Sequence, residues 1–155
     1  MDEKMDSEVV PKRIGPGPGF TLMMLVLAGQ FTREKLIKAL EPTGLHLRHF
    51  GILTCLNFQG PLPQGVAAQR MLMDKSTAVA VIDDLEAWGY IERRRNPNDR
   101  RTYNLVVTDA GLKKVVEVSS IIDQLVKELL GPMNEDELKT FQKPLAYVLK
   151  SRNFF

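Results

Sequence analysis

Apolar residues recur at intervals of three and four along most of this chain, which is the spacing typical of amphipathic α-helices. Glycine and proline interrupt the spacing and indicate where helical stretches end. The pattern predicts helices over residues 20–41, 45–57, 64–72 and 75–88, a long helix from residue 109 to Gly131-Pro132, and a last helix from residue 134. We therefore expect a mainly α-helical protein.

One stretch, from Tyr90 to Val107, has a different period. Leu105 and Val107 alternate with more polar positions, as in a half-buried strand. The turn-forming residues 96–99, Asn-Pro-Asn-Asp, separate this run from a second short run. The segment predicts a β-hairpin, and the order of elements is that of a winged helix-turn-helix flanked by helical arms.

Local signals mark the ends of the last two helices. Thr108 is a suitable N-cap for the long helix, and Asp109 lies favourably at its positive end. Asn134, with Glu137 three residues later, resembles a capping box for the last helix, which Pro144 is expected to kink.

The apolar faces of two helices predict how they pack. In the helix over 75–88, the core stripe is expected to comprise Ala78, Ile82 and Leu85, with Ser76, Val79, Ala80 and Asp83 facing outward. In the long helix, the predicted apolar stripe is Leu112, Val115, Val116, Ser119, Ile122, Val126 and Leu129. Residues 20–41 and 112–150 carry more apolar surface than one chain of this size covers, so we expect an obligate dimer.

Length and composition limit the classes of protein. A chain of 155 residues with 44% hydrophobic residues suits one domain, here 20–155 after a flexible arm over 1–19. A single cysteine excludes an intramolecular disulfide and suits a reducing cytoplasm. The apolar run Phe20 to Ala28 is too short to span a bilayer, so we expect a soluble, cytoplasmic protein.

Positive charge is concentrated in the predicted hairpin. Five arginines against Glu92 and Asp99 leave Tyr90 to Val107 at +3, whereas the whole chain is at +2. Such a local excess is expected where a protein contacts phosphates. The alternative is a solvated charged hairpin without a partner.

The run from Gly44 to Gly111 resembles the MarR family of bacterial transcription regulators. The matching segments are Asp74 to Thr77, Leu85 to Arg93, and Asn98 to Gly111. The family's wing carries Asp-x-Arg and then a strand ending in Leu-Thr-x-x-Gly, and Val107 stands here at the leucine position. The resemblance implies a winged-helix core over 45–108, with dimerisation helices over 20–43 and 109–155.

The resemblance also implies how DNA is bound. The recognition helix 75–88 is expected in the major groove of an inverted-repeat, A·T-rich operator, and the wing 90–107 in the minor groove. Arg101 is expected to enter the minor groove while Asp99 holds the turn, and Arg93 and Arg95 could instead lie against the protein. The full set of expected DNA-binding residues is Gln64, Lys75, Ser76, Thr77, Val79, Ala80, Arg94, Asp99, Arg100 and Arg101.

The chain departs from the family at Val79 and Ala80, where members commonly carry Ser or Thr followed by Arg. An outward apolar pair could contact thymine methyl groups in the major groove. Alternatively, the two residues are incidental to recognition. Ser76 and Thr77 could still donate or accept hydrogen bonds at base edges or phosphates.

Three residues are candidates for an effector pocket: Met23, His46 and His49. Two histidines without further ligands do not predict a metal site, and no cofactor is expected. Cys55 is expected to be a small buried apolar residue, with a redox role as the alternative. The sequence contains no catalytic constellation, so we do not expect an enzyme.

Together these features predict a dimeric, ligand-responsive, DNA-binding transcriptional regulator, in this family most often a repressor. A small amphipathic or aromatic effector would release it from DNA. The alternative is a protein-interaction or ligand-storage module on a winged-helix scaffold that no longer recognises DNA.

Overall fold

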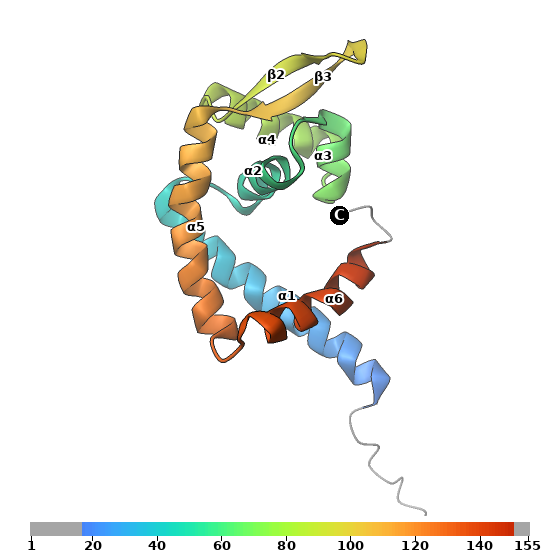
Figure 1. Ribbon diagram of the computed structural model, residues 1–155, viewed down its shortest axis with the longest axis vertical. Coiled ribbons are helices and arrows are strands. Elements are labelled where there is room, and N and C mark those ends of the chain that lie inside the picture. The colour runs from blue at the N-terminus through green and yellow to red at the C-terminus, as the bar shows by residue number, and fades with distance from the viewer. Residues whose placement is uncertain (1–16, 151–155) are drawn as a thin grey trace, which may run out of the picture. The chain divides into compact units, whose positions relative to one another are not determined.

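The computed structural model describes residues 17–150 and, within them, a mainly helical fold with a small antiparallel sheet (Figure 1). The predicted fold class is confirmed. The elements are α1 (Pro18–Leu40), a 3-10 turn η1 (Glu41–Thr43), α2 (Leu47–Gln59), β1 (Leu62–Pro63), α3 (Gln64–Arg70), α4 (Lys75–Ala87), β2 (Ile91–Asn96), β3 (Asp99–Val107), α5 (Asp109–Leu130) and α6 (Glu135–Lys150).

The chain divides into two compact units between Glu34 and Lys35, at a point within α1. The arm predicted over residues 1–19 falls largely on residues 1–16, which lie outside the described residues. Pro18 and Gly19 already belong to α1, so the predicted helix start at residue 20 was late. A proline in the first helical turn loses no hydrogen bond, and this explains the early start.

The core of the second unit lies around α2. Helix α2 packs against α3, α4, α5 and β3. The largest fully buried side chains are Leu40, Ile52, Leu53, Ile82, Leu85, Ile91, Leu105 and Val118. The predicted core stripe of α4 is confirmed, since Ala78, Ile82 and Leu85 are all buried.

The sheet has the strand order β1-β3-β2 and is antiparallel throughout. In the hairpin Ile91 pairs with Val107, and the register shifts between Arg95 and Asn96, next to the turn. Strand β1 was not predicted. It is only two residues long and contains Pro63, so its sequence carries no alternating pattern that could indicate a strand.

Helix α5 is attached to the base of the hairpin at its first turn. The Thr108 hydroxyl accepts a hydrogen bond from the Gly111 N–H at 3.1 Å, which confirms the predicted N-cap, and donates to the Gly89 carbonyl at 2.5 Å. A Cβ atom on Gly111 would lie 2.0 Å from the Tyr90 carbonyl oxygen. Glycine therefore permits this close approach of helix and hairpin.

The predicted apolar stripe of α5 was partly wrong. Val118 and Leu125 are buried, whereas Leu112, Val116 and Val126 are exposed, Val116 to 71%. The helix carries apolar residues on two faces, and the seven-residue spacing of Gly111, Val118 and Leu125 puts one of them against the core. Periodicity alone could not show which face the chain itself covers.

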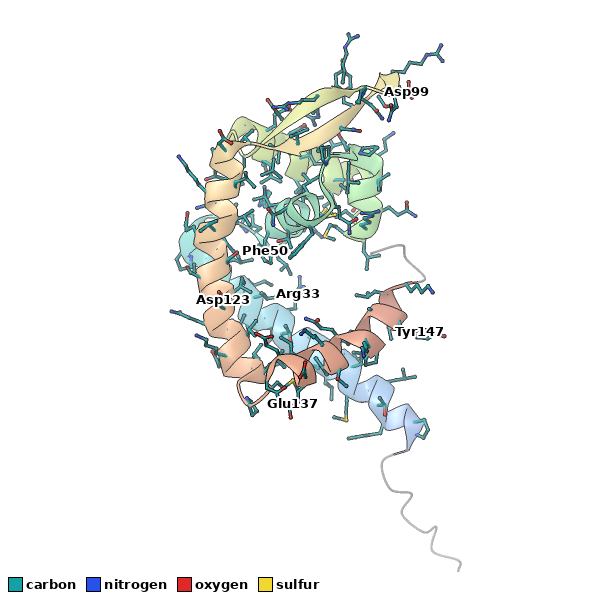
Figure 2. The ribbon with its side chains drawn as sticks, viewed as in Figure 1. Arg33, Phe50, Asp99, Asp123, Glu137 and Tyr147 are labelled. Atoms are coloured by element: carbon teal, nitrogen blue, oxygen red, sulfur yellow. The ribbon has the colours of Figure 1, made fainter. Side chains whose placement is uncertain are left out.

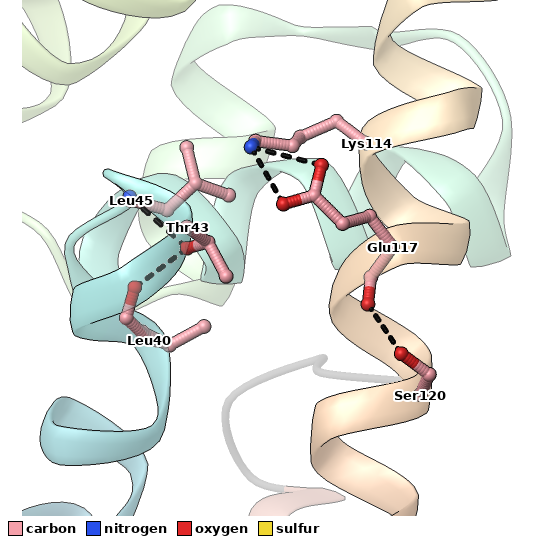
Figure 3. A network of polar contacts seen from close by, with 6 residues as sticks. All are labelled: Leu40, Thr43, Leu45, Lys114, Glu117 and Ser120. Atoms are coloured by element: carbon pink, nitrogen blue, oxygen red, sulfur yellow. Dashed lines mark hydrogen bonds and ion pairs between the residues drawn. The ribbon is translucent and has the colours of Figure 1, made fainter.

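A buried threonine closes the turn between α1 and α2. The Thr43 hydroxyl donates to the Leu40 carbonyl at 2.6 Å and accepts from the Leu45 N–H at 3.2 Å (Figure 3). On the facing stretch of α5, Lys114 forms an ion pair with Glu117 at 3.0 Å. The polar groups of this turn are thus satisfied as Leu40 enters the core.

Helix α6 begins with the predicted capping box. The Glu137 N–H donates to Asn134 Oδ1 at 3.0 Å, and the Asn134 N–H donates to the Glu137 carboxylate at 2.8 Å. Pro144 lies inside the helix, which continues to Lys150. No residue of α6 is buried, and Tyr147 extends into open space (Figure 2).

Candidate nucleic-acid interface

Helix α4 begins at an unusually well-satisfied N-cap. Asp74 Oδ1 accepts the Thr77 N–H at 2.9 Å and the Ser76 hydroxyl at 2.6 Å, and Asp74 Oδ2 accepts the Thr77 hydroxyl at 2.6 Å. These hydrogen bonds, with Ser76 first, hold the pKa of Asp74 well below its usual range. Asp74 was not among the predicted site residues, although an aspartate before a predicted helix is an N-cap signal.

The outward face of α4 is the predicted one. Ser76, Val79, Ala80 and Asp83 are exposed and follow one another at helical spacing. Val79 is 37% exposed. The apolar pair therefore lies on the exposed face of α4, as predicted.

Gln64 lies between the recognition helix and the wing. With Lys75 it lines a hollow of about 520 Å³ between α3 and α4. With Arg93, Thr102 and Tyr103 it lines a second hollow, of about 310 Å³, between α3 and the hairpin. The structure thus brings Gln64 together with residues of both predicted DNA-binding elements.

Arg93 joins the hairpin to α4. Its guanidinium forms ion pairs with Asp83, at 2.5 Å, and with Glu86, while its backbone N–H donates to Glu86 Oε1 at 3.2 Å. The hydrogen bond with Asp83 raises the pKa of Arg93, against the effect of partial burial. The prediction that Arg93 lies against the protein is confirmed, whereas Arg95 is exposed.

The turn of the hairpin is held by its own polar residues. Asp99 Oδ1 accepts the Arg101 N–H at 3.0 Å, and Asn96 Oδ1 accepts the Asn98 N–H at 2.9 Å. Asp99 lies at the far end of the hairpin from the helices (Figure 2). Arg101 at this tip is exposed, so its side chain is accessible to a ligand.

The two arginines expected to contact phosphates differ in what the structure describes. Arg94 forms an ion pair with Glu92, and its side chain remains 66% exposed. The side chain of Arg100 lies outside the described part of the chain.

Sequence reasoning missed the roles of the three acidic residues of α4. Asp83, Asp84 and Glu86 were not among the predicted site residues, but each pairs with the protein itself: Asp83 and Glu86 with Arg93, and Asp84 with His49. The sequence did contain a signal for the ion pairs with Arg93, because three carboxylates lie seven to ten residues before Arg93, at the junction of helix and hairpin.

His49 is a buried link between α2 and the end of α4. Its Nδ1 accepts the His46 N–H at 3.2 Å, so the ring proton is on Nε2, which donates to Asp84 Oδ2 at 3.2 Å. The ring lies edge-on to Trp88, with centroids 4.7 Å apart. Burial lowers the pKa of His49, although Asp84 acts in the opposite direction.

The three predicted effector residues differ in position. His46 and His49 are neighbours, with ring centroids 5.4 Å apart, but His46 is exposed and His49 is only 3% exposed. Met23 is an exposed residue of the other unit. His49 is already engaged by the protein on both ring nitrogens, which leaves it little capacity to bind an effector.

An apolar hollow lies elsewhere on α2. It has a volume of about 510 Å³ and is lined by Phe50, Gly51, Thr54, Cys55, Phe58, Gln59 and Met71. Cys55 is buried as expected, and burial raises the pKa of its thiol. A thiol with a raised pKa is mostly protonated at neutral pH and hence a weak nucleophile.

No helix between residues 17 and 150 combines the length and the apolar character needed to cross a membrane. In the same range, no group of three or more His, Cys, Asp and Glu side chains is arranged to hold a metal ion.

Stability should fall when the pH drops below the ordinary pKa of His49. The unfolded chain takes up a proton on this residue near pH 6.5, whereas the folded protein takes it up only at lower pH. The stabilising contribution is therefore complete above pH 6.5 and decreases as the pH falls to the lowered value. Urea unfolding at pH 7.5 and 5.5 measures the difference.

His49→Gln should reduce this dependence on pH, while His46→Gln, a change of the same kind at an exposed residue, should retain it. An equal pH dependence in wild type and His49→Gln would contradict the assignment.

Comparison with known proteins shows what this chain is similar to. Residues 43–102 match the model of the MarR family. A MarR family transcriptional regulator from Silicibacter pomeroyi is 28% identical, with a TM-score of 0.80 over 94% of this chain and 100% of its own. CouR from Rhodococcus jostii, crystallised with p-coumaroyl-CoA, is 25% identical, with a TM-score of 0.71 over 84% of this chain and 90% of its own.

A sequence relative agrees with these structures. The uncharacterized HTH-type transcriptional regulator YwoH of Bacillus subtilis is 28% identical over 70% of this chain and 78% of its own length. These relatives are named as transcriptional regulators and not as enzymes. The family expected from the wing and recognition-helix motifs is the one whose model matches residues 43–102, and over most of its length the chain is similar to MarR family transcriptional regulators.

Proposed function

We propose that this protein is a homodimeric repressor that binds an inverted-repeat operator and is released by a small effector. Helix α4 enters the major groove, and the hairpin β2–β3 reaches the neighbouring minor groove. One observation carries the proposal: Arg93 fastens the arginine-rich hairpin to α4 through Asp83 and Glu86. The helix and the wing then bind DNA as one rigid unit. Arg94 is exposed for a contact with phosphate, and Arg101 is exposed for insertion into the minor groove.

The exposed apolar surface supports the dimer. Within α1, the exposed large hydrophobic residues are Phe20, Leu22, Met23, Met24, Leu25, Val26, Leu27, Phe31 and Ile37. On α6, Phe141, Tyr147 and Val148 are also exposed. Exposed apolar surface of this extent is rare on soluble monomers and is expected at an interface. A second copy of the chain would cover it and set two α4 helices about 34 Å apart.

Light scattering should give twice the chain mass of 17.5 kDa at micromolar concentration. Leu22→Glu combined with Val26→Glu, one turn apart on α1, should weaken the dimer at least a hundredfold, because each buried side chain contributes about 1.5–3 kcal/mol. Lys139→Glu on α6 changes charge at an exposed polar residue and serves as the control. A wild-type mass of one chain would exclude the proposed dimer.

Arg101→Ala should weaken binding to every DNA sequence and lower the salt slope of log K by about one, because one phosphate-neutralising charge is lost. Mobility shifts at several salt concentrations, on genomic fragments selected by the wild-type protein, measure both quantities. Lys139→Ala removes the same charge from α6 and should change neither. If the folded Arg101→Ala dimer retains full affinity and slope, the wing does not contact DNA as proposed.

The second candidate function is a protein-interaction or ligand-storage module that no longer recognises DNA. Val79 and Ala80 favour it, because an exposed apolar pair on α4 suits a protein partner as well as a thymine methyl. The mobility shift separates the two functions. Binding that fails at low salt for all fragments, including the DNA upstream of the protein's own gene, would favour the module.

The hollow beside Phe58 is the proposed effector site, in place of the pair His46 and His49. Its apolar lining and its volume of about 510 Å³ suit a small aromatic or amphipathic molecule. The binding of p-coumaroyl-CoA by CouR supports a ligand of this kind. An effector could bind more tightly to a dimer in which the two α4 helices are not spaced for DNA, and it would then weaken DNA binding. The size of the effect is set by the ratio of the effector's affinities for the two states of the dimer.

Thermal-shift screening of phenolic acids should find a compound that raises the melting temperature, because a ligand of the folded state stabilises it. Phe58→Ala should abolish the shift at little cost in stability, since this side chain is 80% exposed. Tyr147→Ala removes a similarly exposed aromatic ring from α6 and should retain it. A compound that stabilises both variants equally would bind elsewhere.

A further inference from the structure

The hydroxyl protons of Ser76 and Thr77 are both used within the protein. Each hydroxyl lies 2.6 Å from an oxygen of Asp74. An ionised carboxylate can only accept hydrogen bonds, so both hydroxyls must donate to it. Towards any other partner, the two oxygens therefore present lone pairs and no proton. The sequence-based expectation that they could donate to DNA is thus corrected.

The remainder of the outward face offers no donor either. This face consists of Ser76, Val79, Ala80 and Asp83, all of them described residues. Val79 and Ala80 have no polar side-chain atoms, and Asp83 is an acceptor that is already paired with Arg93. Lys75 is the nearest cation along the helix. It lies about 100° away from Ser76 around the axis and lines the hollow towards Gln64.

The major-groove edges of the bases differ in what they offer such a face. Guanine presents two acceptors, N7 and O6, and pairs best with arginine or lysine. Adenine presents an amino donor at N6, cytosine an amino donor at N4, and thymine a methyl group. An acceptor-and-methyl face can accept from the amino group of adenine or cytosine and pack on the thymine methyl, although adenine N7 and thymine O4 are acceptors as well. Guanine offers this face acceptors only, so it alone has no favourable contact there, which is unfavourable in a desolvated interface.

We infer that Asp74 acts as a specificity-determining positioning residue, which makes Ser76 and Thr77 acceptor-only and directs α4 to base amino groups and thymine methyls. This inference rests on the proposed function, because it requires that α4 enters the major groove. Asp74 itself need not touch a base. It acts through the two hydroxyls, and guanine is disfavoured opposite this face.

The test starts from a random duplex library selected with the full-length wild-type protein. In the selected motif, each adenine is replaced in turn by purine, which lacks only the N6 amino group. At one or more positions the replacement should weaken wild-type binding about fivefold, the effect of one hydrogen bond. Replacing thymines by uracil removes only the methyl group and should weaken binding at the positions opposite Val79 and Ala80.

Asp74→Asn is the informative variant. Asparagine caps helices as well as aspartate does, so the variant should fold, and unfolding in urea checks this. Its amide has a single acceptor oxygen and two N–H donors, so at least one hydroxyl proton becomes free to point towards DNA. The loss on replacing adenine by purine should then fall below twofold. Asp109→Asn, the same change in the first turn of α5, should behave as wild type.

The ratio of the affinity for the adenine-containing duplex to the affinity for the purine-substituted duplex distinguishes a role of Asp74 in base recognition from a merely electrostatic role. Removing a negative charge near phosphates would raise affinity for all sequences alike but would leave the ratio of adenine to purine unchanged. An unchanged ratio in Asp74→Asn therefore overturns the inference. The inference is also overturned if the selected motif requires guanine N7 and O6 contacts opposite α4 and the Lys75→Met variant still requires them. Failure to select any DNA overturns both this inference and the proposed function.

Discussion

The double ion pair of Arg93 with Asp83 and Glu86 is the contact on which the placement of the hairpin against α4 depends. A two-stranded ribbon is only marginally stable by itself, and its direction is poorly defined without a neighbour. Here the neighbour is α4, and Arg93 of β2 connects the ribbon to it, because the backbone and the guanidinium of Arg93 both contact α4. The angle between recognition helix and wing is thus determined by side chains of these two elements.

The other end of the hairpin is fastened just as closely. Thr108 bonds to Gly89, and Gly111 lies against Tyr90, so the base of the hairpin and the first turn of α5 form one junction. Trp88 next to this junction packs on His49 of α2. A displacement of α5 would therefore be transmitted to both α4 and the hairpin, which gives the proposed effector a physical route to change the spacing of the proposed DNA-binding elements.

Charge is divided between the two elements. The wing is basic and has exposed arginines, whereas α4 carries carboxylates at Asp74, Asp83 and Asp84 that are all engaged in hydrogen bonds or ion pairs. Contacts of arginine with phosphate provide affinity without information about sequence, whereas base edges provide specificity. The arrangement suits a regulator whose wing supplies affinity and whose helix discriminates by shape, methyl groups and amino groups.

Local signals in the sequence were sufficient for the helices and the hairpin, although they missed the two-residue strand β1 and placed the start of α1 two residues late. The turn at Asn96 to Asp99, the caps at Thr108 and Asn134 and the buried stripe of α4 all depend on residues within a few positions of one another. The tertiary structure alone decided which apolar face of α5 is covered, that β1 pairs with β3, and which carboxylates hold Arg93 and His49. These features join residues far apart in the chain, and no periodicity or spacing specifies which of several chemically suitable partners will meet.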